Sequence, residues 1–139
     1  MLVTTRTVAF QEVDAAGLVF FPHFLTYAHE AMEQLFAPLL EGYVGLILGR
    51  RIGLPAVHVD AEYSAPLVYG ESARIETSVV HLGNRSMVIR YRFVRERDQV
   101  LAAVVRHTVV VTDLDKKKSC PMPDDVRRAA EAHLEVEAP

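Results

Sequence analysis

The sequence predicts an α+β domain in which one long helix packs on an antiparallel sheet. A helical pattern comes early, and four segments with strand character follow it, at residues 56–65, 72–82, 86–97 and 100–112. Consecutive strands with short connections favour antiparallel pairing, and one amphipathic helix covers only one face of such a sheet. With a strand before the helix, five strands are expected in one sheet.

Length and composition limit the class of protein. A chain of 139 residues has the usual size of one domain, so we expect residues 1–139 to form a single domain. Half of the residues are hydrophobic and the formal charge is only −3, which disfavours a disordered or nucleic-acid-coating protein. Cys120 is the only cysteine and lies outside any redox or metal motif. No apolar run approaches the roughly 20 residues of a membrane span, and no signal peptide is recognisable. We expect a cytoplasmic protein without a nucleic-acid or membrane partner.

The first part of the chain predicts a strand, a turn and a helix. Residues 3–13 are rich in Thr and Val, with Val8 and Phe10 alternating against polar neighbours, which indicates a half-buried strand. Turn-forming Asp and Gly interrupt the pattern after it. A helix is expected from Phe21 or Pro22 to about Pro38, because proline is favoured in the first turn. Apolar residues then recur at helical spacing: Phe24, Tyr27, Ala28, Ala31 and Leu35.

The second part of the chain predicts the remaining elements. Four glycines weaken any helix in residues 39–55, where we expect a short helical turn and a loop. A terminal helix is expected from Pro123 to about residue 135, since Asp124 and Asp125 suit a helix start. Alternation places two sets of side chains on shared strand faces: Val57, Val59, Ala61 and Tyr63 on one strand, and Met87, Ile89, Tyr91 and Phe93 on another. A single helix leaves the other sheet face and the edges uncovered, so we expect dimerisation.

One acid in the chain has a chemically useful position. Asp14 lies in a turn immediately before the apolar start of the predicted helix. Unpaired backbone N–H groups at a helix start can polarise a carbonyl and hold the oxyanion that forms on attack. A nearby carboxylate can attack that carbonyl or activate a water molecule. By spacing alone, however, a turn former or cap is the more frequent role of such an Asp.

The segment around Asp14 resembles a known signature. The run Asp-Ala-Ala-Gly-Leu-Val-Phe-Phe-Pro-His-Phe, residues 14–24, resembles the active-site signature of hotdog-fold thioesterases of the 4-hydroxybenzoyl-CoA thioesterase family. The resemblance continues through the strand order and the turn at residues 65–71. It implies a hotdog fold, in which a five-stranded antiparallel sheet wraps around one long helix, with a short C-terminal helix here. It also implies an acyl-CoA thioesterase that needs no cofactor, since coenzyme A is part of the substrate.

The Ala-Ala-Gly form, with His29-Glu30-Ala31 further along the helix, also resembles the 1,4-dihydroxy-2-naphthoyl-CoA hydrolases. Both groups of relatives act on aromatic acyl-CoAs. The resemblance therefore implies an aromatic, 4-hydroxybenzoyl-like acyl group, with naphthoyl-CoA or an aliphatic acyl-CoA as alternatives. Homodimers or homotetramers are implied as well.

Roles for individual residues follow from the same resemblance. Asp14 is implied as nucleophile or general base, the backbone N–H of Phe21 as the group that polarises the thioester carbonyl, and Gly17 as the residue that permits close approach in the turn. The remaining implied residues concern the substrate. Asn84 and Arg85, in the turn between two strands, would hold the phosphates of coenzyme A. Glu30 is a candidate helix acid for activating water.

Three phenylalanines near this turn are ambiguous. Phe20, Phe21 and Phe24 are candidates for lining the pocket, although core packing is expected for at least two of them.

Other readings remain open. His58, Asp60 and Glu62 alternate on one strand and could gather a metal ion, but no further ligand follows at motif spacing, so no metal site is expected. A hotdog dehydratase is a rival reading, because residues 21–24 resemble its His-Phe-Pro motif in reversed order, without the following glycines. A non-catalytic acyl-CoA binding protein is another, and it would not depend on Asp14. A serine hydrolase is disfavoured because no Gly-x-Ser-x-Gly elbow occurs.

Overall fold

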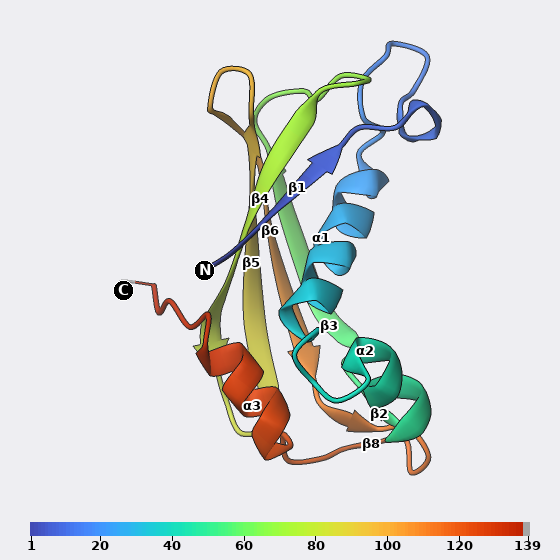
Figure 1. Ribbon diagram of the computed structural model, residues 1–139, viewed down its shortest axis with the longest axis vertical. Helices are drawn as coiled ribbons and strands as arrows, with labels where there is room; N and C mark the ends of the chain where they lie inside the picture. The colour runs from blue at the N-terminus through green and yellow to red at the C-terminus, as the bar shows by residue number, and fades with distance from the viewer. Residues whose placement is uncertain (138–139) are drawn as a thin grey trace.

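A five-stranded antiparallel sheet is the largest element of the computed structural model, which describes residues 1–137 (Figure 1). Its strands, in spatial order, are β1 (Leu2–Thr7), β4 (Ser72–Leu82), β5 (Ser86–Arg95), β6 (Val100–Val110) and β3 (Ala56–Tyr63). Every neighbouring pair is antiparallel. The predicted α+β class with an antiparallel sheet is confirmed.

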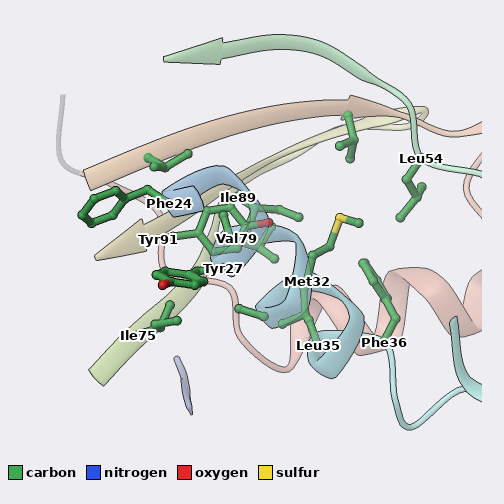
Figure 2. Close-up of a cluster of buried hydrophobic side chains, with 14 of the residues drawn as sticks. Phe24, Tyr27, Met32, Leu35, Phe36, Leu54, Ile75, Val79, Ile89 and Tyr91 are labelled. Carbon is green, nitrogen blue, oxygen red and sulfur yellow. The ribbon is translucent and has the colours of Figure 1, made fainter. Parts of the chain in front are cut away.

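The helix α1 (Pro22–Leu35) packs on one face of this sheet. It begins at Pro22, as expected, and ends before Pro38, because the residue ahead of a proline is disfavoured in helical backbone. Its buried face meets the inner side chains of β4 and β5, and Figure 2 shows this core: Phe24, Tyr27, Met32 and Leu35 against Ile75, Val79, Ile89 and Tyr91. The predicted inner face of β5 is confirmed, since Met87, Ile89, Tyr91 and Phe93 are all fully buried.

The structure differs from the sequence expectation at several element bounds. The first strand stops at Thr7, and the short 3-10 helix η1 (Phe10–Glu12) replaces its predicted second half. The carboxylate of Glu12 accepts the N–H of Ala9 at 2.8 Å, so this acid turns the chain back on itself. The C-terminal helix α3 is shorter than expected (Asp124–Glu131).

The segment expected as a helical turn and loop holds more structure than predicted. It contains α2 (Gly42–Val44), the π-helical turn η2 (Gly45–Gly49) and β2 (Ile52–Gly53). The strand β2 pairs with β7 (Thr112–Asp113), which pairs with β8 (Lys118–Ser119), and the three form a second small sheet. Strands of two residues carry too little alternation to be read from sequence.

The C-terminal segment pairs with β4 where β1 ends, through Val79 N–H to His133 O at 2.9 Å and Glu135 N–H to Val79 O at 2.8 Å. Among residues 1–137, no strand pairs with the outer edge of β1 or of β3. On β3, Val57 and Val59 are 61% and 41% exposed. An uncovered strand edge with exposed valines is a surface suited to pairing with another chain. Within residues 1–137, no helix is long and apolar enough to cross a membrane.

Candidate active site

The turn before α1 holds Asp14 by its own backbone. Asp14 N–H donates to Leu18 O at 2.8 Å, and Gly17 N–H donates to Asp14 O at 3.0 Å. The side-chain Oδ1 of Asp14 accepts the N–H groups of Ala16 at 2.9 Å and Leu18 at 3.3 Å. One carboxylate oxygen of Asp14 therefore stabilises the turn, as expected for a turn-forming Asp. The second, Oδ2, accepts no hydrogen bond from residues 1–137, and the side chain is exposed.

The start of α1 leaves one backbone donor free. Pro22 has no N–H, and the N–H groups of His23 and Phe24 donate to the carbonyls of Phe20 and Phe21. Phe20 N–H donates to Glu12 O at 3.0 Å. In the described chain, the N–H of Phe21 has no acceptor. A free N–H at the positive end of a helix is suited to binding a carbonyl oxygen that gains negative charge.

Asp14 and Phe21 line one pocket. Its volume is about 510 Å³, and its walls are mainly apolar and aromatic, with lining residues that include Asp14, Phe20, Phe21, Phe24, Tyr63 and Leu67. This size lies within the usual range for small-molecule sites, about 300 to 1,000 Å³. Phe20 and Phe21 are 49% and 60% exposed, whereas Phe24 is buried. The expectation that at least two of these rings belong to the core is wrong, because the turn projects the first two over the pocket.

Gly17 supports the turn rather than the pocket wall. Its φ of +80° is a conformation that glycine adopts without strain. Gly17 O accepts Tyr69 N–H at 3.2 Å, and Val19 N–H donates to Leu67 O at 2.9 Å. These bonds join the turn to residues 67–69, and residues 64–67 line the pocket. The sequence indicated the turn at residues 65–71 but not that the first residues of this turn line the site.

A buried acid anchors the turn to the rest of the fold, and it was missed in the sequence. Glu12 is only 5% exposed. Its Oε1 accepts Arg6 Nη1 at 3.0 Å and the Tyr27 hydroxyl at 2.9 Å, while the Arg6 guanidinium lies 4.7 Å from the centre of the Tyr27 ring. Burial raises the pKa of Glu12, but these hydrogen bonds and that from Ala9 N–H outweigh it and hold the pKa below its ordinary value. No local pattern in the sequence signals this cluster, because Arg6, Glu12 and Tyr27 come from three separate elements.

Glu30 lies apart from this pocket. Its carboxylate pairs with Arg6, with Nε to Oε2 at 2.9 Å, and it lines a different cavity between β1 and α1. Within residues 1–137 of one copy, the structure does not bring Glu30 to Asp14, so its water-activating role stays a prediction.

Asn84 and Arg85 are also far from Asp14 within one chain. They form the turn between β4 and β5, which lies at the α3 end of the sheet, whereas the turn with Asp14 lies at the opposite end (Figure 1). Arg85 Nη1 donates to Ser119 O at 2.8 Å, and Asn84 O accepts Met122 N–H at 3.0 Å. Both residues are exposed. A single copy of the chain therefore does not combine these two residues with the pocket.

The three residues weighed as metal ligands lie on the exposed strand β3. His58 Nε2 is 3.4 Å from Asp60 Oδ2, and among residues 1–137 no three such ligand side chains converge.

Comparison with known proteins places this fold and turn in one family. Residues 8–130 match the model of the Thioesterase-like superfamily. The chain belongs to this superfamily. The thioesterase resemblance of the turn is thereby confirmed, as is classification of the chain as a thioester hydrolase.

Individual members of the superfamily are similar to this thioesterase over nearly its whole length. A 1,4-dihydroxy-2-naphthoyl-CoA hydrolase from Synechococcus sp. (strain CC9605) is 32% identical, with 94% of this chain and 90% of the relative covered. A solved thioesterase superfamily structure from Jannaschia sp. CCS1 is 27% identical, covers 97% of this chain and 94% of its own, and has a TM-score of 0.86. A solved gentisyl-coenzyme A thioesterase is 26% identical, covers 92% and 98%, and has a TM-score of 0.81.

Proposed function

We propose that this protein hydrolyses an acyl-CoA thioester in the pocket at the start of α1, with Asp14 as the essential carboxylate. One observation carries the proposal. The carboxylate of Asp14, with its Oδ2 unpaired among the described residues, lines the same aromatic pocket as Phe21, whose N–H is free. A thioester carbonyl that accepts this N–H would present its carbon to the carboxylate.

Asp14 has two routes to the same products. As a nucleophile, Oδ2 bonds to the carbonyl carbon, the C–S bond breaks, coenzyme A leaves as the thiolate, and water then hydrolyses the mixed anhydride. As a general base, Asp14 takes a proton from the water molecule that attacks. In both routes the Phe21 N–H stabilises the oxyanion. Mass spectrometry of rapidly quenched enzyme distinguishes the two routes, since only the nucleophilic route adds the mass of the acyl group to the chain.

The acyl group is proposed to be aromatic. The rings of Phe20, Phe21, Phe24 and Tyr63 surround the pocket, and aromatic rings pack favourably edge to face. Two of the relatives above are named as a 1,4-dihydroxy-2-naphthoyl-CoA hydrolase and a gentisyl-CoA thioesterase, which favours a hydroxylated aromatic acyl group. Naphthoyl-CoA is better supported by these relatives than the 4-hydroxybenzoyl-CoA that the sequence first implied.

A panel of CoA thioesters tests this function. Thiol release is followed for 1,4-dihydroxy-2-naphthoyl, 4-hydroxybenzoyl, butyryl and palmitoyl thioesters. We expect kcat/KM for the better aromatic substrate to exceed that for either aliphatic one by roughly tenfold or more, because pocket contacts of this size discriminate by about 10 to 200-fold. Binding of every thioester without thiol release would instead indicate an acyl-CoA binding protein.

A homodimer is proposed to complete the coenzyme A site. The uncovered edge of β3 is the surface for pairing, and a second copy would bring an exposed Arg85 toward the pocket, which one copy does not. Sedimentation equilibrium should give at least twice the 15.5 kDa of one chain, and a tetramer would give four times this mass.

Arg85 is expected to act on substrate binding rather than on chemistry. Replacing it by alanine should raise KM for a CoA thioester by about 5 to 20-fold while kcat stays within twofold, since a charge-assisted hydrogen bond contributes roughly 1.5 to 3 kcal/mol before solvent screening. Thioesters of pantetheine, which lack the nucleotide phosphates, should show no such rise. Arg128→Ala on exposed α3 is the matched control. Equal effects on CoA and pantetheine thioesters would remove Arg85 from phosphate binding.

A further inference from the structure

Tyr63 joins the edge strand to the helix start inside the pocket. It is the last residue of β3 and contributes its ring to the same wall as Ser64 and Leu67. Its ring centre lies 5.2 Å from that of Phe24 and 6.3 Å from that of Phe21, and both pairs are edge to face. Tyr63 thus links the strand β3 to two aromatic residues of the helix start and helix.

The backbone around Tyr63 is held firmly. Tyr63 lies opposite Ala103 of β6, and the N–H groups of Ser64 and Ala65 both donate to Ala102 O, at 2.8 and 3.1 Å. The strand end is therefore fixed to β6, and the ring contacts with Phe21 and Phe24 hold the side chain. A preformed wall loses little conformational freedom when a ligand binds.

The hydroxyl of Tyr63 adds a second connection. It donates to Phe21 O at 3.3 Å, the carbonyl of the residue whose N–H has no acceptor among the described residues. Burial raises the pKa of Tyr63, so the hydroxyl keeps its proton and remains a donor. At 3.3 Å this is a long hydrogen bond, so the hydroxyl should matter less than the ring.

The remaining aromatic residues of the pocket are less suited to recognising a ring. Phe24 is 4% exposed and already packs on Phe93 at 5.3 Å, so it forms the floor. Phe20 packs on Phe21 and His23. Phe20 and Phe21, 49% and 60% exposed, belong to the turn and the helix start, whereas Tyr63, 46% exposed, lines the pocket from a strand that is paired with β6.

We propose that Tyr63 is a specificity-determining residue, whose ring selects aromatic over saturated acyl groups and whose hydroxyl helps to position the first turn of α1. This inference rests on the proposed thioesterase function. An aromatic acyl ring can pack edge to face on Tyr63, whereas a saturated ring of similar size offers only apolar area.

Two substrates of similar size test the proposal: benzoyl-CoA and cyclohexanecarbonyl-CoA. In the full-length protein, Tyr63→Leu should lower the benzoyl to cyclohexanecarbonyl ratio of kcat/KM by about 2 to 12-fold, the range that an aromatic pair contributes beyond its buried area. Tyr63→Phe should keep the ratio and lower kcat less than about 3-fold on both substrates, because only the long hydrogen bond is lost. Tyr69→Leu is the matched control, since Tyr69 is exposed and packs on Phe10 outside the pocket.

The outcomes separate this inference from the proposed function. A ratio that Tyr63→Leu leaves unchanged overturns the specificity role, even if both substrates are hydrolysed more slowly, since a purely structural role lowers the two rates equally. If Tyr63→Phe lowers the benzoyl to cyclohexanecarbonyl ratio as much as Tyr63→Leu does, the role assigned to the ring is overturned. If the wild-type protein releases no thiol from any CoA thioester, the proposed function itself fails, whatever the Tyr63 variants do.

Discussion

Replacing Asp14 by asparagine should abolish most thioester hydrolysis. Asparagine keeps an oxygen that can accept the N–H groups of Ala16 and Leu18, so the turn should persist. It removes the negative charge needed to attack the carbonyl or to take a proton from water. We expect kcat to fall by about 100 to 10,000-fold with KM within a few-fold of wild type, as for the loss of a group that acts in the transition state.

Asp115→Asn is the matched control for this variant. Asp115 is an exposed acid paired with Arg51, outside the pocket, and its replacement should leave kcat unchanged. Circular dichroism and sedimentation should show both variants folded and with wild-type mass. Activity of Asp14→Asn close to that of the wild type would contradict the assigned mechanism, since the turn would then be the only role of Asp14.

Replacing Glu12 by alanine should have the largest effect on stability. It removes the acceptor of Arg6, Tyr27 and Ala9 N–H and leaves the buried Tyr27 hydroxyl without its partner. We expect the free energy of unfolding to fall by about 2 to 3 kcal/mol, rather than the 3 to 5 kcal/mol of a fully buried pair, because the Arg6 side chain is 27% exposed and keeps Glu30. Urea unfolding measures this change.

The same residue predicts a pH dependence of stability. Since the pKa of Glu12 is lowered in the folded chain, its ionised form stabilises the fold. This contribution is complete above the ordinary glutamate pKa of about 4.3 and is lost as pH falls below it, through the lowered value. Glu12→Gln should therefore lose less stability between pH 6 and pH 3 than the wild type. An equal loss of stability in Glu12→Gln and the wild type would assign the acid sensitivity to other carboxylates. Glu62→Gln, at an exposed position of β3, serves as the control variant.

Local patterns predicted most of the sheet and the long helix, because their side chains alternate or recur at fixed spacing. The strand β4 begins at Ser72 and ends at Leu82, as expected, and α1 begins at Pro22. The small sheet of β2, β7 and β8 was not predictable, since pairing between Ile52 and Asp113 depends on contacts distant in sequence. Glu12 was missed for a similar reason: nothing in its neighbours indicates that Tyr27 and Arg6 will bury it.

The candidate site was predictable only in part. The turn around Asp14 and the start of α1 lie together in the sequence, so their proximity follows from local structure. Tyr63 joins them from an edge strand about 50 positions away, and only the register of β3 on β6 brings it there. Glu30 was a candidate helix acid for activating water, but helical periodicity turns it toward β1 and Arg6.

A crystal structure of the Asp14→Asn variant with an unhydrolysed aromatic acyl-CoA tests the central claim most directly. The account predicts that the thioester oxygen lies about 2.7 to 3.1 Å from the nitrogen of Phe21, with the carbonyl carbon facing the side chain of residue 14 and the acyl ring packed against Tyr63. A thioester bound with its carbonyl away from the start of α1, or outside this pocket, would contradict it.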